Sequence, residues 1–229
     1  FRWSHCNSGY WFSVWIHRSL MRTHSFPRIS WVAFLLWPNL SFAHSPSKGL
    51  AGFYTGILHV YSEVSLVIGL LALGLLVGQS CSTVKQRKLL VVFLFAIVMS
   101  CAMASFALME ITPKAVLLVH WTLVVFVCLH AALLPKWREK FAFASVPLMG
   151  LIMGQLTVPD AGELWPFLVT LAGSITACVL GFLYSFSLVD FLYQRFQLLW
   201  QRTILRVVSA WLFAISFLLL AVQLANKHA

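Results

Sequence analysis

The sequence predicts an all-α membrane protein, a polytopic bundle of six transmembrane helices behind a cleaved signal peptide. Of its 229 residues, 61% are hydrophobic and 10% are charged, and no soluble domain of this size would tolerate that composition without a large exposed apolar surface. The apolar runs are long, and about 20 helical residues cross the roughly 30 Å hydrocarbon layer of a bilayer. Residues 89–99, LLVVFLFAIVM, are apolar on every side, which excludes the alternating pattern of barrel strands.

The first 43 residues are predicted to lie outside the bundle. Residues 1–20 show no helical or strand pattern, and we interpret them as upstream sequence or an overhang. Residues 21–43 have the order of a signal peptide: a basic stretch, an apolar core, and small residues at Ser41 and Ala43 before the cut. Cleavage would leave His44 as the mature N-terminus outside the cytoplasm; the alternative is an uncleaved anchor.

The remaining chain, residues 44–229, is the predicted membrane domain, and its first helix covers 52–78. That run could cross a bilayer, yet it contains His59 and Glu63. Four residues apart, they would lie on one helical face, one turn apart. Ionisable groups in spanning helices usually face a bundle interior or a wet cavity, so we expect a cation or proton site. The alternative is a buried hydrogen bond between the two that only fixes helix packing.

Small residues in this and later helices predict close packing. Gly74 and Gly78 have GxxxG spacing, which permits close approach by another helix. The second helix (89–109) has Ser100 among several small residues suited to an interface, and the fifth (165–184 or beyond) is rich in Gly, Ala, Ser and Thr.

The third helix (115–134) contains His120 and His130. Ten residues apart, they fall on different faces and cannot easily share one ligand site. We interpret each first as a packing residue, and His120 also as a candidate contributor to a metal site.

The fourth helix (141–158) carries Met149 and Met153 at a spacing that puts both on one face. Thioethers are soft ligands that favour Cu(I) over nickel. Methionine is also an ordinary filler of apolar cores, which is the alternative interpretation.

The sixth helix (207–225) is plain and apolar, and the basic, aromatic segment before it is either a helix extension or an interfacial amphipathic helix. Basic residues gather in every second loop, and Lys114 is the exception in an outer one. Because cytoplasmic loops collect Lys and Arg, this pattern predicts a bacterial inner-membrane protein with both mature termini in the periplasm. It also explains the net charge of +10 without a nucleic-acid partner.

Five cysteines occur without CxxC or other metal-like spacing, and we interpret them as small buried side chains. The sequence has no P-loop, nucleophile elbow or HExxH motif, so we do not expect an enzyme.

The order of these features resembles the HupE/UreJ family of hydrogenase and urease accessory membrane proteins. Members have a mature end near Ala-His and a first helix of the form GFxxGxxHPxxGxDHxL; residues 52–59 here read GFYTGILH. The resemblance covers about 44–226 and implies nickel or cobalt uptake. This chain departs from the motif after His59, with Val60 in place of Pro and no Gly, Asp or His at the later positions.

In the fourth helix, the two methionines stand where the family shows a HGxAHG-like signature. We therefore predict a HupE/UreJ-like permease or accessory protein for a transition-metal cation, with no tightly bound cofactor. Its expected partners are the lipid bilayer, the metal ion, and a metalloenzyme maturation system or membrane complex. The alternative is a structural or assembly subunit that does not transport. The candidate metal ligands are His59 and Glu63 near the midplane, with Met149, Met153, His120 and, at the mouth, His44.

Overall fold

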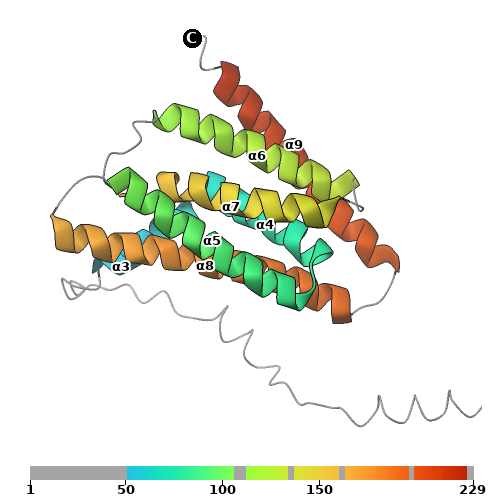
Figure 1. Ribbon diagram of the computed structural model, residues 1–229. Helices are drawn as coiled ribbons and strands as arrows, with labels where there is room; N and C mark the ends of the chain where they lie inside the picture. The colour runs from blue at the N-terminus through green and yellow to red at the C-terminus, as the bar shows by residue number, and fades with distance from the viewer. Residues whose placement is uncertain (1–50, 106–111, 134–136, 160–162, 196–198, 226–229) are drawn as a thin grey trace, which may run out of the picture. The chain divides into compact units, whose positions relative to one another are not determined.

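The computed structural model describes residues 51–105, 112–133, 137–159, 163–195 and 199–225. Within these ranges the chain is helical and joined by short connections, with no strand (Figure 1). The helices are α3 (Ala51–Ser62), α4 (Val64–Ser80), α5 (Thr83–Ser105), α6 (Pro113–Leu133), α7 (Arg138–Leu156), α8 (Leu164–Arg195) and α9 (Leu199–Ala225). The predicted signal peptide and His44 lie outside the described residues.

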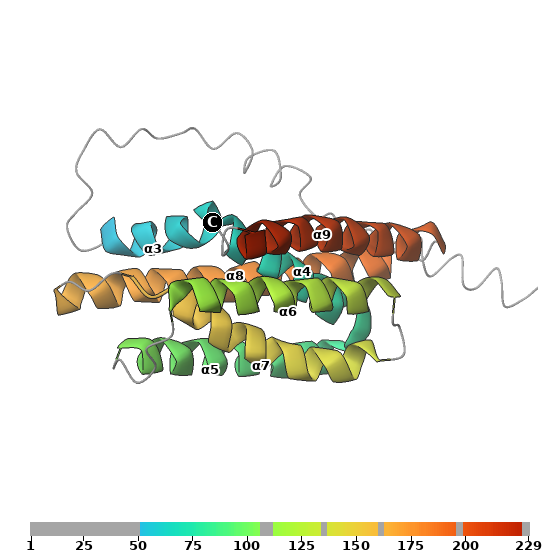
Figure 2. The same ribbon diagram turned by 90° about the horizontal axis from the view of Figure 1, so that it is seen from above.

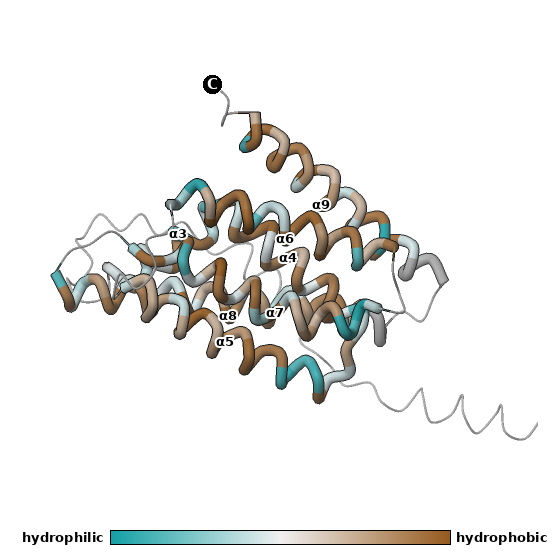
Figure 3. Tube along the Cα trace, turned by 45° about the horizontal axis from the view of Figure 1, so that its top comes forward, coloured by the Kyte–Doolittle hydropathy of each residue, from teal (hydrophilic) through white to brown (hydrophobic). Residues whose placement is uncertain are grey.

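Several helices are long and apolar enough to cross a membrane. Within the described chain these are α5, α6, Leu164–Leu192 of α8 and Thr203–Ala225 of α9, with a fifth if α3 and α4 together form one span. Figure 3 shows hydrophobic residues along most of α5, with hydrophilic ones gathered at one end. The protein is therefore all-helical with helices of membrane-spanning length, which agrees with the predicted class.

α4 lies at the centre of the helical unit. It contacts α3, α6, α7, α8 and α9, while α5 packs mainly on α7, α6 on α9, and α3 on α8. In Figure 2, α5 and α7 run side by side, as do α6 and α9. The buried core follows this arrangement, since its fully enclosed side chains include Leu66 and Leu73 of α4, Phe93 of α5 and Phe182 of α8.

Close contacts between helices depend on small residues. A Cβ atom on Gly78 would lie 2.6 Å from the Cβ of Val189, and one on Gly74 would overlap Ser185, both on α8. The predicted close approach at this GxxxG pair is confirmed. Ser100 of α5 is buried and donates a hydrogen bond to the Leu151 carbonyl of α7, as the small-residue interface predicted.

Hydroxyl groups along the helices find acceptors within the protein. Many donate to the carbonyl four residues earlier in their own helix, where lipid could offer no partner. Those with this bond at 2.7–2.9 Å are Thr55, Ser105, Thr122, Thr170, Thr176, Ser185, Ser209 and Ser216.

The prediction of one continuous helix over 52–78 is wrong. The chain leaves helical geometry at Glu63, which has an extended backbone (φ −84°, ψ 106°), and α3 and α4 are bent by 72°. His59 and Glu63 therefore do not share a face of one straight helix, although the Glu63 amide still donates to the His59 carbonyl at 3.1 Å.

Two further boundaries differ from the predictions. α5 begins at Thr83, so the basic residues expected in a loop before 89 occupy its first turns. In the described residues of the segment before the last predicted helix, α8 continues to Arg195 and α9 begins at Leu199, so both neighbouring helices extend into it. Of the two interpretations of that segment, the helix extension is the one observed.

Candidate cation pocket at the helix break

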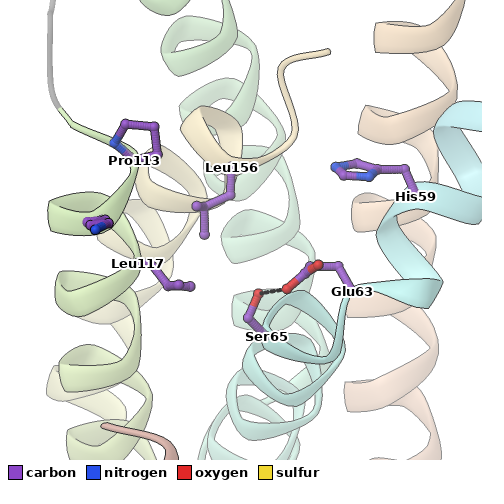
Figure 4. A pocket seen from close by; sticks show the side chains of 7 residues that line it. His59, Glu63, Ser65, Pro113, Leu117 and Leu156 are labelled. Atoms are coloured by element: carbon purple, nitrogen blue, oxygen red, sulfur yellow. Dashed lines mark hydrogen bonds between the residues drawn. The ribbon is translucent and has the colours of Figure 1, made fainter. Parts of the chain in front are cut away.

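A pocket of about 290 Å³ lies beside the break between α3 and α4. Four helices and the break contribute to its wall (Figure 4). The lining residues are His59 from the last turn of α3, Glu63 at the break, Ser65 from the first turn of α4, Pro113, Lys114 and Leu117 from the start of α6, and Leu156 from the end of α7.

The polar side of the pocket is held by local hydrogen bonds. The Ser65 hydroxyl donates to Oε1 of Glu63 at 3.0 Å, the bond drawn dashed in Figure 4. The His59 carbonyl accepts from the Ser62 hydroxyl at 3.1 Å. These bonds fix the backbone at the break, while the His59 and Glu63 side chains themselves are exposed on the pocket side.

The pocket carries charges of both signs. Glu63 supplies a carboxylate and Lys114 an ammonium group, and His59 adds an imidazole that can bind either a proton or a metal. Leu117 and Leu156 form the apolar side. A cation in this pocket would be attracted by Glu63 and repelled by Lys114, so its binding depends on direct contact with the His59 nitrogen and the Glu63 oxygens.

A second polar position lies deeper, where α6 meets α4. His120 is completely buried, and its Nε2 is 2.9 Å from the carbonyl oxygen of Ser65. A Cβ atom on Gly69 would lie 2.6 Å from Cε of Met153 and 2.8 Å from Cε1 of His120. Gly69 therefore gives room for an imidazole from α6 and a thioether methyl from α7 to meet over α4.

Four of the six predicted site residues fall into two pairs. His59 and Glu63 share the pocket, and His120 and Met153 meet over Gly69. Met149 is fully buried in the main hydrophobic cluster. His44 lies outside the described residues.

The helix ends in the pocket wall show where His59 and Glu63 lie in the bundle, while their midplane position in a membrane stays a prediction. Pro113 and Lys114 begin α6, and Leu156 ends α7, so the pocket lies at one end of these helices. The break turns α3 away from the direction of α4.

His130 has a packing environment, as interpreted from its spacing. Its Nδ1 donates to the Phe126 carbonyl at 2.9 Å, and its ring stacks on Phe141 with centroids 3.8 Å apart. It takes no part in the pocket.

Sequence reasoning missed Lys114, Gly69 and the linking role of Ser65. Lys114 had a usable signal, because it is a basic residue in a loop predicted to lie outside. The other two had none, since a helical Ser and a helical Gly are common in membrane proteins.

Two findings bear directly on the function. Among the described residues, no group of three or more His, Cys, Asp or Glu side chains is placed to hold a metal ion. Comparisons of the chain with protein-family models, with curated proteins and with solved structures found no match. What the protein does is therefore inferred from its own residues.

Proposed function

We propose that this protein is a membrane permease or accessory protein for a transition-metal cation, related to the HupE/UreJ family. The observation that carries the proposal is the pocket at the helix break, where His59 and Glu63 face one cavity and Ser65 connects its wall to buried His120. Broken helices in membrane transporters commonly form ion sites. An imidazole and a carboxylate are ligands that nickel and cobalt accept.

The proposed topology has six spans. α3 and α4 together form the first, broken span, and α7 is added to the four long apolar helices although its first turn carries Arg138, Glu139 and Lys140. An ion pair of 2.5 Å between Lys85 and Glu139 supports placing the starts of α5 and α7 on one side.

That side is basic, which favours the cytoplasm. The pocket then opens toward the periplasm of a bacterial inner membrane, with both mature termini on the same side. An inward-moving cation would be driven by the membrane potential, worth about 2.3 kcal/mol per charge per 100 mV. By the family resemblance, the metal would be nickel or cobalt, and Met149 and Met153 make copper the alternative. The partner would be a metalloenzyme maturation system or membrane complex.

A second candidate function is a structural or assembly subunit that does not transport. The Lys114 ammonium group at the pocket favours it, because it opposes a bound cation. In that case the hydrogen bond between Ser65 and Glu63 would serve to fix the helix break.

Metal accumulation in cells separates the two functions. We expect His59→Ala and Glu63→Gln each to lower uptake of nickel or cobalt by roughly tenfold, the scale of losing one group that supports a metal. His130→Gln is the matched control, because that imidazole is packed away from the pocket. The amount of each variant in the membrane fraction is measured alongside. Equal uptake by wild type, both pocket variants and the control would contradict the permease and leave the structural subunit.

A further inference from the structure

One buried imidazole nitrogen has no use in the fold. His120 has no exposed surface, and within the described part of the chain its Nδ1 has no hydrogen-bond partner. Leaving a buried polar atom unsatisfied costs about 1–3 kcal/mol, and such atoms in native proteins call for an explanation.

The hydrogen bond on the other side of the ring determines which nitrogen is free to bind. Nε2 of His120 faces the Ser65 carbonyl at 2.9 Å, and because a carbonyl oxygen only accepts, Nε2 carries the proton. The neutral ring then has its lone pair on Nδ1. Histidines that bind metals typically donate their other ring N–H to a carbonyl or carboxylate, so His120 already has the arrangement of a metal ligand.

The methyl end of a thioether side chain lies near this ring. The Met153 methyl and His120 Cε1 both approach the space that a side chain on Gly69 would fill, to within 2.6 and 2.8 Å. Met153 is fully buried, as is Met149 one turn before it on the same helix. An imidazole nitrogen and a thioether sulfur are donors that Cu(I) accepts and that hard cations do not prefer.

We propose that His120 Nδ1 and the Met153 sulfur form an interior site for a soft monovalent cation of the Cu(I) class. The proposal rests on the proposed function and narrows its substrate class. Ser65 lines the pocket and its carbonyl accepts a hydrogen bond from His120, so one residue links the pocket wall to this ring. The ion binds and leaves as Cu(I), with no change of oxidation state.

Binding to the purified full-length protein in detergent tests the site. Cu(I) is titrated against a chromophoric Cu(I) chelator, and Ag(I) serves as a probe that does not change oxidation state. We expect one ion bound in the interior and a loss of at least about tenfold in affinity for Met153→Leu and for His120→Gln, comparable to losses at other metal sites. Met153→Leu nearly conserves volume, so the fold should persist; thermal unfolding without metal checks this.

The chain offers matched controls for both substitutions. Met99→Leu changes a methionine that is 42% exposed on α5, and His130→Gln changes the imidazole stacked on Phe141. Both should bind like wild type. X-ray absorption of the Cu(I)-loaded protein should show a sulfur neighbour that Met153→Leu removes.

Unchanged affinity and an unchanged sulfur neighbour in Met153→Leu would overturn the interior site. This outcome differs from failure of the proposed function. If pocket variants keep full metal uptake while Met153→Leu still loses Cu(I), the permease is contradicted and the interior site stands.

Discussion

Ser65 makes a hydrogen bond to each of the two polar positions, the pocket and buried His120. Its hydroxyl donates to Glu63 in the pocket, and its backbone carbonyl accepts from His120 in the interior. One residue thus holds the carboxylate at the break and orients an imidazole of another helix. A shift of the first turn of α4 would disturb both positions together.

At this scale the sequence could predict candidate residues, but only in part how they are arranged. The spacing of His59 and Glu63 predicted one face of a continuous helix; the helix is broken between them, yet both line one pocket. The meeting of His120 with Met153 over Gly69 could not be predicted, because it depends on how α4, α6 and α7 pack. No local pattern encodes a contact between three helices.

The Cys81 thiol, at the end of α4, should react slowly in the folded protein. It is 8% exposed, and burial is the main cause that raises its pKa above the ordinary value. Because the thiolate is the reactive form, a raised pKa leaves less of it at neutral pH. We expect alkylation by iodoacetamide at pH 7.5 to be several-fold slower than in denatured protein and to keep rising above pH 9.

Mass spectrometry of the Cys81 peptide over time measures this rate. The same peptide in protein unfolded with SDS is the control. Equal rates in the two states at pH 7.5 would show that the thiol is not protected.

At the scale of elements, the break between α3 and α4 is the largest departure from the sequence prediction. Residues 60–66, VYSEVSL, contain neither Gly nor Pro, so no local signal ends a helix there. The cause lies in packing: a Cβ on Gly56 would overlap the Thr170 carbonyl, and one on Gly173 would overlap the Phe53 carbonyl. These contacts bring the α3 and α8 backbones together and set the direction of α3.

The helix lengths were more predictable, because apolar runs determine them. The ends of α6 and α7 lie close to the predicted limits, and α9 covers the whole predicted range. α8 continues to Arg195, past residue 184, where the predicted end was left open. The start of α5 was missed because Lys and Arg are good helix formers as well as loop residues.

Gly56→Ala should separate α3 from α8. An added methyl would meet backbone atoms of Thr170 and Ser174, the latter at 2.8 Å, and backbone cannot rotate away. We expect a loss of roughly 1–3 kcal/mol, the usual cost of overpacking, despite the helix propensity gained by replacing Gly. Thermal unfolding in detergent measures the change.

Gly52→Ala is the matched control on the same helix. Its new methyl would first meet the Thr170 hydroxyl oxygen at 3.0 Å, a side-chain atom that can turn. Its stability should change by less than half as much. If Gly56→Ala is as stable as wild type, the close contact does not set the position of α3.

For the whole molecule, the proposed topology depends on where the charged residues lie. The ion pair of Lys85 with Glu139 has both side chains more than two-fifths exposed, so it contributes at most about 1 kcal/mol. The ion pair matters more for the arrangement of the helices than for stability, since it joins the starts of α5 and α7 at one end. The sequence predicted both segments to be cytoplasmic from their basic residues, and the ion pair brings the two segments together as that topology requires.

Labelling from the two sides of the membrane tests this topology. Lys114→Cys should react with a membrane-impermeant maleimide on intact spheroplasts, and Lys85→Cys only after the membrane is opened. Glu163→Cys, before α8, should behave like Lys114→Cys and serves as the same-side control. Labelling of Lys85→Cys and Lys114→Cys from one side would refute the six-span arrangement.

The 72° bend has a consequence for the surrounding lipid. With 12 residues, α3 is only about 18 Å long at 1.5 Å per residue, too short to bridge the hydrocarbon layer unaided. The first amides of α4 have no carbonyl of their own helix to bond, and acyl chains offer none. In the proposed topology, water would therefore reach Glu63 along the break, and the bilayer beside it would be locally thinned.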